Sequence, residues 1–290
     1  MLFYYVFMFS LNNYKFKVCE VKRKMTILFK AKTQNAYTIK ILAELLQNSI
    51  KTACFEIDNS GIKLCMMDHH RSILIHLFLE SENFSVYKFV PKEKMFLGIN
   101  LNHFHKMLKS IKKKDSVCLF IDDESPTDLG IKVIPKENTR ITTSFVKIQC
   151  IQTLDIDLPE GYSKPIIVPS SEYHKMCKDM AHIGTTTSIV SKNFHIKFIC
   201  NAGSIMKRHV EFGENEGSDD EDDKQEYSSD LDTEQLSRIT KISGLSSSIH
   251  IYTKEGLPIL FKTDIGGLGK ISIYMKTKDL IENDNRSIEE

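Results

Sequence analysis

The sequence predicts an α+β protein made of two similar domains, each combining an antiparallel, strand-rich sheet with two helices. Three observations lead to this fold class. Four amphipathic segments occur as two pairs along the 290 residues, short apolar segments fill the chain between them, and the order helix, strand, turn, strand occurs in both halves. A chain of this length forms one large or two ordinary domains, and the repeated order favours two.

Each predicted helix follows a polar residue that can cap its first turn, and its apolar side chains are three or four residues apart. The first helix places Ile39, Leu42 and Leu46 on one side, and the second does the same with Phe104 and Leu108. The third and fourth helices have shorter apolar faces. The predicted helices span residues 35–50, 100–112, 170–183 and 232–243.

Segments of alternating or continuous apolar residues, bounded by Gly, Asn, Asp or Pro, are typical of strands. Two pairs of them form predicted hairpins, with turns at residues 58–61 and 191–193. The predicted strands are 53–57, 62–66, 72–79, 117–121, 188–190, 196–200, 249–252, 259–261 and 271–275.

The division into domains follows from this repeat, whose two halves meet between residues 134 and 164. The first residues, MLFYYVFMFSL, are apolar but too few to span a bilayer, which needs about 20 residues. We expect a disordered extension or a misplaced start codon at 1–24, an N-terminal domain at 25–145, a linker at 146–164, a C-terminal domain at 165–280, and a tail at 281–290.

The charge is unevenly distributed, although the formal net charge is only +1. Residues 211–234 hold 12 acidic residues and one Lys, so the rest of the chain carries a surplus of about 12 positive charges. A surplus of this size permits a polyanionic partner. Residues 211–232 are so acidic and so poor in apolar residues that we expect a disordered outer loop there, with Ser218, Ser228 and Ser229 as possible phosphorylation sites in what is otherwise a solvated spacer.

The composition, with 41% hydrophobic and 27% charged residues, is that of a globular protein. The seven cysteines are an odd number without a CxxC pair, and no histidine cluster has zinc-ligand spacing. This pattern favours reduced thiols in an intracellular compartment.

Basic residues recur on the predicted polar faces of all four helices. Lys106, Lys109 and Lys112 are spaced by three on the second helix, opposite its apolar side. On a single helix, such lysines are usually only solvating. Because all four helices agree, we expect their outward faces to form one basic surface that contacts phosphates without reading base sequence. Its other members are Lys40, Lys175, Lys178, His182, Arg238 and Lys241.

Two short motifs suggest catalysis but are weak. Residues 68–70 read Asp-His-His, as in metal-dependent phosphoesterases, but the chain has no matching DxD upstream to complete a two-metal site. Residues 266–270 resemble a phosphate loop, yet Ile271 stands where Ser or Thr is required. A turn between two strands explains the second motif better. We therefore expect no enzymatic activity, no metal and no cofactor.

Several stretches resemble one protein family from about Leu28 to Lys278. Residues 53–84 (ACFEIDNSGIKL and MDHHRSILIHLFLESENF) resemble its first-domain core, and residues 98–116 (GINLNHFHKMLKSIKKKDS) resemble its second helix. Residues 158–184 (LPEGYSKPIIVPSSEYHKMCKDMAHIG) and 257–275 (LPILFKTDIGGLGKISIYM) resemble its linker end, third helix and last strands. The family is proliferating cell nuclear antigen, the DNA sliding clamp of eukaryotes and many large DNA viruses.

The resemblance implies a DNA clamp fold that forms a homotrimeric ring, with helices around duplex DNA and sheets outside. Lys40, Lys106, Lys109, Lys175, Lys178, His182 and Lys241 match channel positions, whereas Gln47 and Glu234 stand where the family has basic residues. Closure by paired edge strands is implied for residues 139–147 and 204–210. The expected interface residues are Thr139, Ile141, Thr143, Phe145, Ile205, Lys207 and His209.

The family also captures peptides with a Gln and paired aromatics in an apolar pocket beside the linker. Here Arg71 replaces the usual histidine, and Lys276 and Thr277 replace an Ala-Pro pair, so partner preference is expected to differ. The family's ubiquitin-accepting lysine aligns with Asn193, one position from Lys192. The pocket residues implied are Met67, Arg71, Ile156, Leu158, Pro258 and Tyr274.

The function implied is that of a processivity factor, which tethers DNA polymerase and other replication and repair proteins to DNA and is loaded by a separate clamp loader. The expected location is the nucleus or the intracellular site of viral DNA replication, with no membrane partner. Two other binding functions stay open: a subunit of a heterotrimeric checkpoint-type clamp, and a monomeric viral processivity factor that binds DNA by surface charge.

Overall fold

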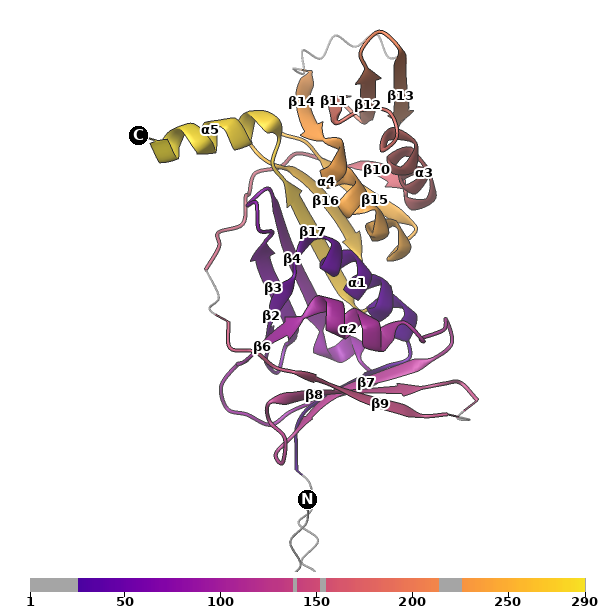
Figure 1. The fold of residues 1–290 in the computed structure, drawn as a ribbon, viewed down its shortest axis with the longest axis vertical. Coiled ribbons are helices and arrows are strands. Elements are labelled where there is room, and N and C mark those ends of the chain that lie inside the picture. Colours follow the sequence, from indigo (N-terminus) through magenta and orange to yellow (C-terminus); the bar gives the residue numbers. More distant parts are fainter. Residues whose placement is uncertain (1–25, 138–139, 152–154, 214–225, 290) are drawn as a thin grey trace, which may run out of the picture.

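The structure is a computed structural model that describes residues 26–137, 140–151, 155–213 and 226–289. It is an α+β structure in which all strand pairs are antiparallel. The eight-stranded sheet occupies the middle of the molecule in Figure 1, with the five-stranded sheet below it and the four-stranded sheet above it, and the helices α1 to α4 lie to the right of its strands. The predicted fold class is confirmed.

Strands from both halves build the sheets. The N-terminal half contributes β1 (Ile27–Thr33), β2 (Thr52–Ile57), β3 (Gly61–Met67), β4 (Ile73–Glu80), β5 (Val86–Phe89), β6 (Met95–Asn100), β7 (Ser116–Asp122), β8 (Asp128–Ile134) and β9 (Thr142–Lys147). The C-terminal half contributes β10 (Ile166–Pro169), β11 (Thr186–Lys192), β12 (His195–Ala202), β13 (Met206–Phe212), β14 (Tyr227–Asp232), β15 (Ser248–Tyr252), β16 (Ile259–Asp264) and β17 (Gly269–Met275).

The strand orders reveal the internal duplication. In the first half, β1-β7-β8-β9 and β4-β3-β2-β6 are runs of neighbouring strands, and in the second half β10-β15-β16-β17 and β13-β12-β11-β14 repeat them. The two halves join where β17 pairs with β4 over seven residues, which makes one eight-stranded sheet across the domain boundary. The strands equivalent to this pair, β9 and β13, lie at the edges of the other two sheets.

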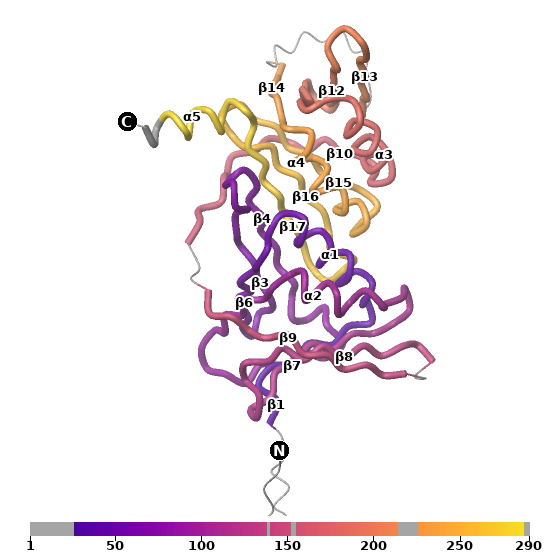
Figure 2. The backbone as a smooth tube through the Cα atoms, in the orientation of Figure 1, coloured from indigo at the N-terminus to yellow at the C-terminus, as the bar shows by residue number. Residues whose placement is uncertain are grey.

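The main helices are α1 (Ala36–Ser49), α2 (Leu101–Leu108), α3 (Ser170–Met180) and α4 (Thr233–Arg238), followed by the 3-10 turn η2 (Thr240–Gly244). They bury their apolar faces on the sheets in one continuous hydrophobic core that spans both halves. The helices also touch one another: α1 packs on α2 and η2, and α3 packs on η2 and α4. The tube in Figure 2 shows α1 and α2 side by side in the N-terminal half, with α3 and α4 of the C-terminal half above them.

Three predicted helices are longer than the real ones, and the third of the four ends at Met180 rather than at residue 183. The second ends at Leu108 rather than at residue 112, because Ile111 turns inward to be buried and the backbone N–H of Lys112 donates to the Asp115 carboxylate at 2.8 Å. The fourth breaks after Arg238, where the Thr240 hydroxyl donates to the carbonyls at the end of α4. Hydroxyl groups that bond the preceding turn often end or bend helices.

The predicted acidic loop and the predicted C-terminal tail both contain regular structure. Strand β13 extends to Phe212 and β14 occupies residues 227–232, so the predicted outer loop of 211–232 is too wide at both ends. Ser228 and Ser229 lie in β14, paired with Val190 and Ile189, while Ser218 lies outside the described residues. Most of the predicted tail is helical, because α5 (Lys278–Glu289) is a 12-residue helix. Its first turn is held by Thr277, whose hydroxyl and carbonyl accept bonds from Leu280 and Ile281.

The predicted hairpin turns are confirmed. The Asp58 carboxylate accepts hydrogen bonds from Ser60 and Gly61 and so closes the turn between β2 and β3. Asn193 adopts a left-handed φ of 55° between β11 and β12, a conformation that asparagine tolerates. The glycine-rich residues 266–268 also form a tight turn, between β16 and β17, rather than a phosphate loop.

Candidate nucleic-acid interface and peptide pocket

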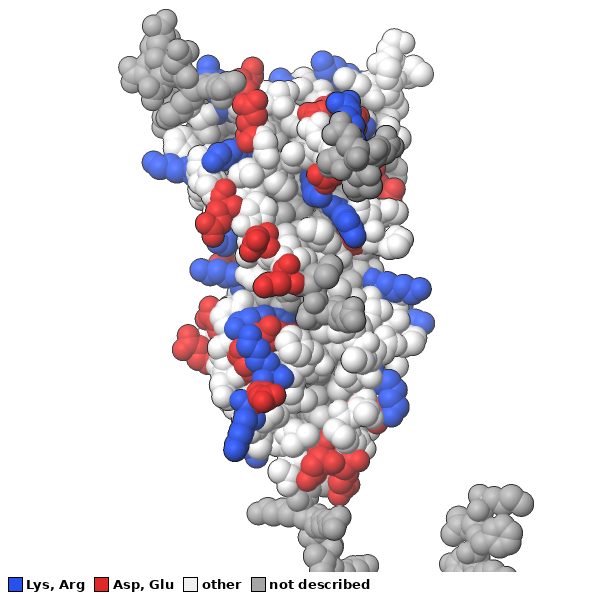
Figure 3. Space-filling model, turned by 90° about the vertical axis from the view of Figure 1, so that its left-hand side faces the viewer, with Lys and Arg blue, Asp and Glu red and all other residues white. Residues whose placement is uncertain are grey.

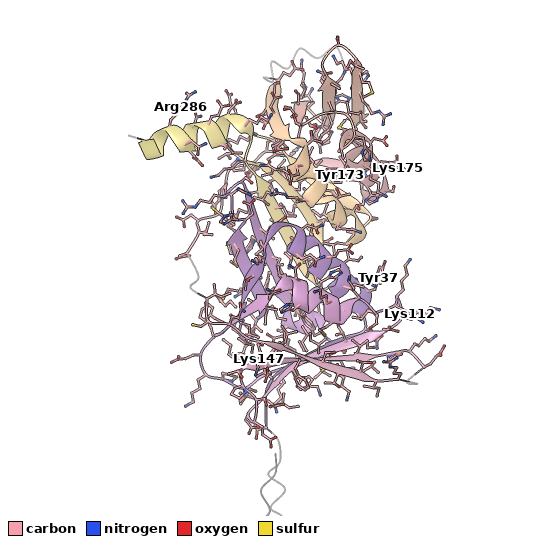
Figure 4. All side chains as sticks on the ribbon, in the orientation of Figure 1. Tyr37, Lys112, Lys147, Tyr173, Lys175 and Arg286 are labelled. Atoms are coloured by element: carbon pink, nitrogen blue, oxygen red, sulfur yellow. The ribbon has the colours of Figure 1, made fainter. Side chains whose placement is uncertain are left out.

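The helix layer carries the predicted basic residues in three different states. Five of them are exposed, and no ion pair among the described residues involves them: Lys106, Lys109, Lys112, Lys178 and His182. Figure 4 labels Lys112 and Lys175 on the side of the molecule that the helices occupy. These side chains are available to an anionic partner.

Two of the predicted DNA-contacting residues bond to nearby groups of the helix layer. The Lys40 ammonium donates to the backbone carbonyls of Lys109 and Ile111, at 2.7 and 3.1 Å, and so ties α1 to the chain after α2. Lys175 is exposed but pairs with Glu172 one turn away at 2.8 Å. Exposed pairs of this kind contribute little to stability, so Lys175 can exchange this carboxylate for a phosphate.

Two further predicted DNA-contacting residues form ion pairs between the two halves of the chain. Lys241 on η2 pairs with Glu44 on α1 at 2.9 Å. Arg238 on α4 pairs with Glu234 at 2.7 Å and lies 3.6 Å from the buried carboxylate of Asp68. Arg238 is therefore partly turned toward a loop of the first half and away from the predicted basic surface.

Two lysines outside the predicted set lie at the same surface. Lys113 and Lys114 are exposed in the turn after α2, and the Lys113 ammonium lies 6.0 Å from the centre of the Tyr37 ring. The run Lys112-Lys113-Lys114 could have revealed them. The spacing of three predicts a helical stripe that reaches Lys112, but Lys109 and Lys112 lie beyond the last helical residue.

The predicted interface strands lie at open sheet edges. β9 is the last strand of the five-stranded sheet and β13 is the first of the four-stranded sheet. Large apolar side chains near these edges are exposed, among them Ile141, Phe145, Ile205 and Met206. Thr143 is exposed on β9, Lys207 and His209 are exposed on β13, and Thr139 lies outside the described residues. Open edges with exposed apolar side chains are suited to pairing with another strand.

The predicted peptide pocket is a hollow of about 80 Å³ beside the linker. Four of the six predicted residues, Met67, Arg71, Pro258 and Tyr274, line it. The other two, Ile156 and Leu158, pack in the neighbouring apolar cluster around Leu74, Leu260 and Tyr274. The prediction missed further lining residues that spacing alone does not reveal: Ser72, Leu74, Asp157 and Pro159. Lys276, predicted at the rim, is also a lining residue.

Side chains from distant segments hold the linker against this hollow. The Tyr162 hydroxyl donates to the Pro258 carbonyl at 2.7 Å, and its ring lies against those of Tyr252 and Tyr274. The Lys254 ammonium donates to the Gly161 carbonyl at 2.7 Å. Figure 3 views this side of the molecule and shows acidic and basic side chains interspersed on it.

The other wall of the hollow is the loop after β3, which Asp68 organises. The Asp68 carboxylate is almost fully buried and accepts bonds from the backbone N–H groups of Ser72 and Ile73, at 2.7 and 2.9 Å, and from the Ser72 hydroxyl. Arg71 takes a left-handed φ of 55° in this turn. The oxygens of Asp68 are thus committed to the loop, and among the described residues no group of three His, Cys, Asp or Glu side chains is placed to hold a metal ion.

Two sequence models of one family match the chain in succession. The N-terminal domain of proliferating cell nuclear antigen matches residues 28–157, and the C-terminal domain matches residues 157–278. The chain belongs to the proliferating cell nuclear antigen family. The resemblance found in the sequence is confirmed, and the structure has the two-domain clamp fold of this family.

Two curated relatives in this family match most of the chain. A probable DNA polymerase sliding clamp 1 of Paramecium bursaria Chlorella virus 1 is 24% identical over 254 residues, which are 86% of this chain and 96% of the relative. A proliferating cell nuclear antigen of Chaetomium thermophilum is 23% identical over 257 residues, covering 87% and 98%. Almost all of helix α5 lies beyond the region that the family models match.

Proposed function

We propose that this protein is a DNA polymerase processivity factor, a sliding clamp that closes as a homotrimeric ring around duplex DNA and tethers replication and repair proteins to it. Membership of the proliferating cell nuclear antigen family supports the processivity function. The function is binding rather than catalysis. Within the described residues no helix is long and apolar enough to cross a membrane.

The repeated strand order is the observation that supports the proposed ring. Within the chain, β17 of one half pairs with β4 of the other. The equivalent strands, β9 and β13, each lie at the edge of a different sheet, and no other described strand pairs with their outer edges. Pairing β9 of one subunit with β13 of the next repeats the internal junction between subunits. A head-to-tail contact of this kind closes into a ring when its rotation divides a full turn.

Sliding requires contacts that do not depend on base sequence. Lys106, Lys109 and Lys178 are exposed on the helix layer, which faces the hole in such a ring. Phosphate contacts by lysines have nearly the same energy at each base step, so the ring can move along the duplex without a large barrier. Enclosure, rather than tight binding, keeps the protein on DNA.

Partner capture is assigned to the hollow beside the linker. Its walls offer Met67, Leu74 and Tyr274 for aromatic or aliphatic side chains of a peptide, and its rim offers Arg71, Asp157 and Lys276 for polar groups. Apolar hollows with a few polar groups are typical peptide and ligand sites. The partners proposed are DNA polymerase, the clamp loader and other proteins that carry such peptides. The proposed location is the nucleus or the site of viral DNA replication.

The first test is the mass of the full chain in solution, measured by light scattering after size exclusion at several concentrations. We expect three times the chain mass of 33.4 kDa. Ile141→Asp, beside the edge strand β9, should reduce the mass to that of a monomer. The matched control is Ile167→Asp, which changes a comparably exposed isoleucine on β10 and should leave the trimer intact.

Other masses indicate the alternative functions. A monomer at all concentrations contradicts the homotrimer and favours a subunit of a heterotrimeric clamp or a monomeric processivity factor. Retention on circular DNA then separates enclosure from surface binding. At a salt concentration that screens phosphate contacts, a closed ring stays on circular DNA and leaves the DNA only after it is linearised. A surface-bound monomer dissociates from both circular and linear DNA at that salt concentration.

The pocket is tested with a labelled peptide that contains a Gln and paired aromatics. Met67→Lys places a charge in the hollow without emptying the core, and we expect at least tenfold weaker binding by fluorescence anisotropy. Met107→Lys on α2 is the matched control and should bind the peptide normally. Equal affinities for the two variants would contradict the assignment of the pocket.

A further inference from the structure

One face of the five-stranded sheet β5-β1-β7-β8-β9 points away from the core. Side chains on the opposite face, such as Phe29, Leu119 and Ile131, are fully or almost fully buried. Because side chains alternate along a strand, the residues between them lie on the other side of the sheet. We call this side the outer face. It is distinct from the helix layer proposed to face duplex DNA and from the peptide pocket.

The strand register places four lysines on the outer face in two adjacent rows. One row crosses the sheet as Lys88, Lys30, Phe120, Gly130 and Phe145. The next row is Val86, Lys32, Cys118, Lys132 and Thr143. Neither row contains Asp or Glu, and cross-strand neighbours are about 5 Å apart. The rows therefore concentrate positive charge on a small area.

These lysines are not neutralised by carboxylates. No ion pair among the described residues includes Lys30, Lys32, Lys88 or Lys132. Three of them converge on the Cys118 thiol. Burial raises the pKa of Cys118, and the positive charges of Lys30, Lys32 and Lys132 oppose that rise. Like charges held together without a counter-charge favour binding of a polyanion.

An aromatic ring lies flat in the same patch. A Cβ atom built on Gly130 would be 2.4, 2.6 and 2.7 Å from the three tip carbons of the Phe120 ring. Near-equal distances to these three atoms mean that the ring covers the glycine with its face rather than its edge. Phe120 is only partly buried, and it lies beside Lys30 in the register. Phe145 meets this ring edge-on at 6.1 Å.

We propose that the outer face binds single-stranded nucleic acid, with Lys30, Lys32, Lys88 and Lys132 on phosphates and one base stacked on Phe120. Proteins that bind single-stranded nucleic acid combine basic side chains, which contact phosphates, with aromatic rings, on which bases stack. Any base can stack on such a ring, because every base has a flat face. A duplex has its base faces covered by stacking and cannot use the ring. An acidic peptide would satisfy the lysines but not the ring.

The assay is fluorescence anisotropy of a labelled oligothymidine with the full-length protein, measured over a series of salt concentrations. Four phosphate contacts predict that log K falls with log salt with a slope of about −3 for a single strand. The outer-face variant is K30Q/K32Q/K132Q, which should flatten the slope by about 2. The matched control, K106Q/K109Q on the helix layer, should leave single-strand binding unchanged and weaken binding to duplex.

Phe120→Leu separates nucleic acid from an acidic peptide, because it keeps every charge and removes the ring. We expect at least about fivefold weaker binding of oligothymidine, the lower end of what one stacked base contributes. A glutamate-rich peptide of equal charge should bind more weakly than oligothymidine and be insensitive to this change. Single-strand binding that resists the outer-face variant, or is lost in the helix-layer control instead, overturns the proposal. Equal binding of oligothymidine by wild type and Phe120→Leu also overturns it, in favour of an acidic protein partner.

Discussion

The buried carboxylate of Asp68 should be one of the most sensitive positions in the protein. Asp68→Ala removes the acceptor of the Ser72 and Ile73 backbone N–H groups and of the Ser72 hydroxyl, and the countercharge of Arg238. Each buried N–H left without a partner costs about 1 to 3 kcal/mol. We therefore expect Asp68→Ala to lower the free energy of unfolding by about 3 to 5 kcal/mol, the range found when one partner of a buried pair is removed.

Asp68→Asn provides an internal comparison. Both N–H groups donate to the same oxygen, Oδ1, and asparagine keeps an acceptor there. Only the charge and the second oxygen are lost, so the expected cost is about 1 to 2 kcal/mol. Asp157→Ala, at an exposed position of the same hollow, should change stability by less than about 0.5 kcal/mol.

The measurement is urea denaturation at one fixed protein concentration, because subunit association contributes to the apparent stability. The expected order of midpoints is wild type, Asp157→Ala, Asp68→Asn and Asp68→Ala, from highest to lowest. The loop also forms one wall of the hollow, so Asp68→Ala should weaken peptide binding as well. A loss below about 1 kcal/mol for Asp68→Ala, or equal losses for the two Asp68 variants, would refute the reasoning.

Three further predictions follow from individual contacts. Burial raises the pKa of Asp58, but hydrogen bonds from Ser60 and Lys63 outweigh it and lower that pKa from 3.8 to about 2. The ionised carboxylate stabilises the fold above its unfolded pKa. We expect wild type to exceed Asp58→Asn in free energy of unfolding by about 1 kcal/mol after allowance for solvent screening. In acid titrations of stability this difference should vanish between pH 4 and 2. Tyr162→Phe removes the bond to Pro258 and should cost about 1 kcal/mol, with faster hydrogen exchange in residues 155–161; unchanged exchange would contradict its role in holding the linker. Glu44→Gln removes the ion-pair partner of Lys241. The slope of log K against log salt for duplex binding should then steepen by about 0.9, while the free energy of unfolding changes by less than about 1 kcal/mol. An unchanged slope would show that Lys241 does not reach phosphate.

Local pattern determined much of the fold. The apolar spacing of residues 35–50 and the turn residues at 58–61 and 191–193 depend on interactions within a few residues, and the structure confirms these elements. The repeated order of elements indicated two similar domains. Family resemblance then added the pocket positions, of which Met67, Arg71, Pro258 and Tyr274 do line one hollow.

Only the tertiary structure decided which charged side chains are available. Lys40, Arg238 and Lys241 have the same sequence pattern as Lys106 and Lys178, but their partners come from segments distant in sequence. The predicted helix ends were wrong for the same reason. The apolar periodicity would continue each helix, but the burial of Ile111 and the hydrogen bond from the Thr240 hydroxyl end the helices earlier. The joining of β4 to β17, which leaves β9 and β13 open, and the outer-face rows likewise depend on strand register. Register is set by long-range pairing and packing, which spacing along one segment does not encode.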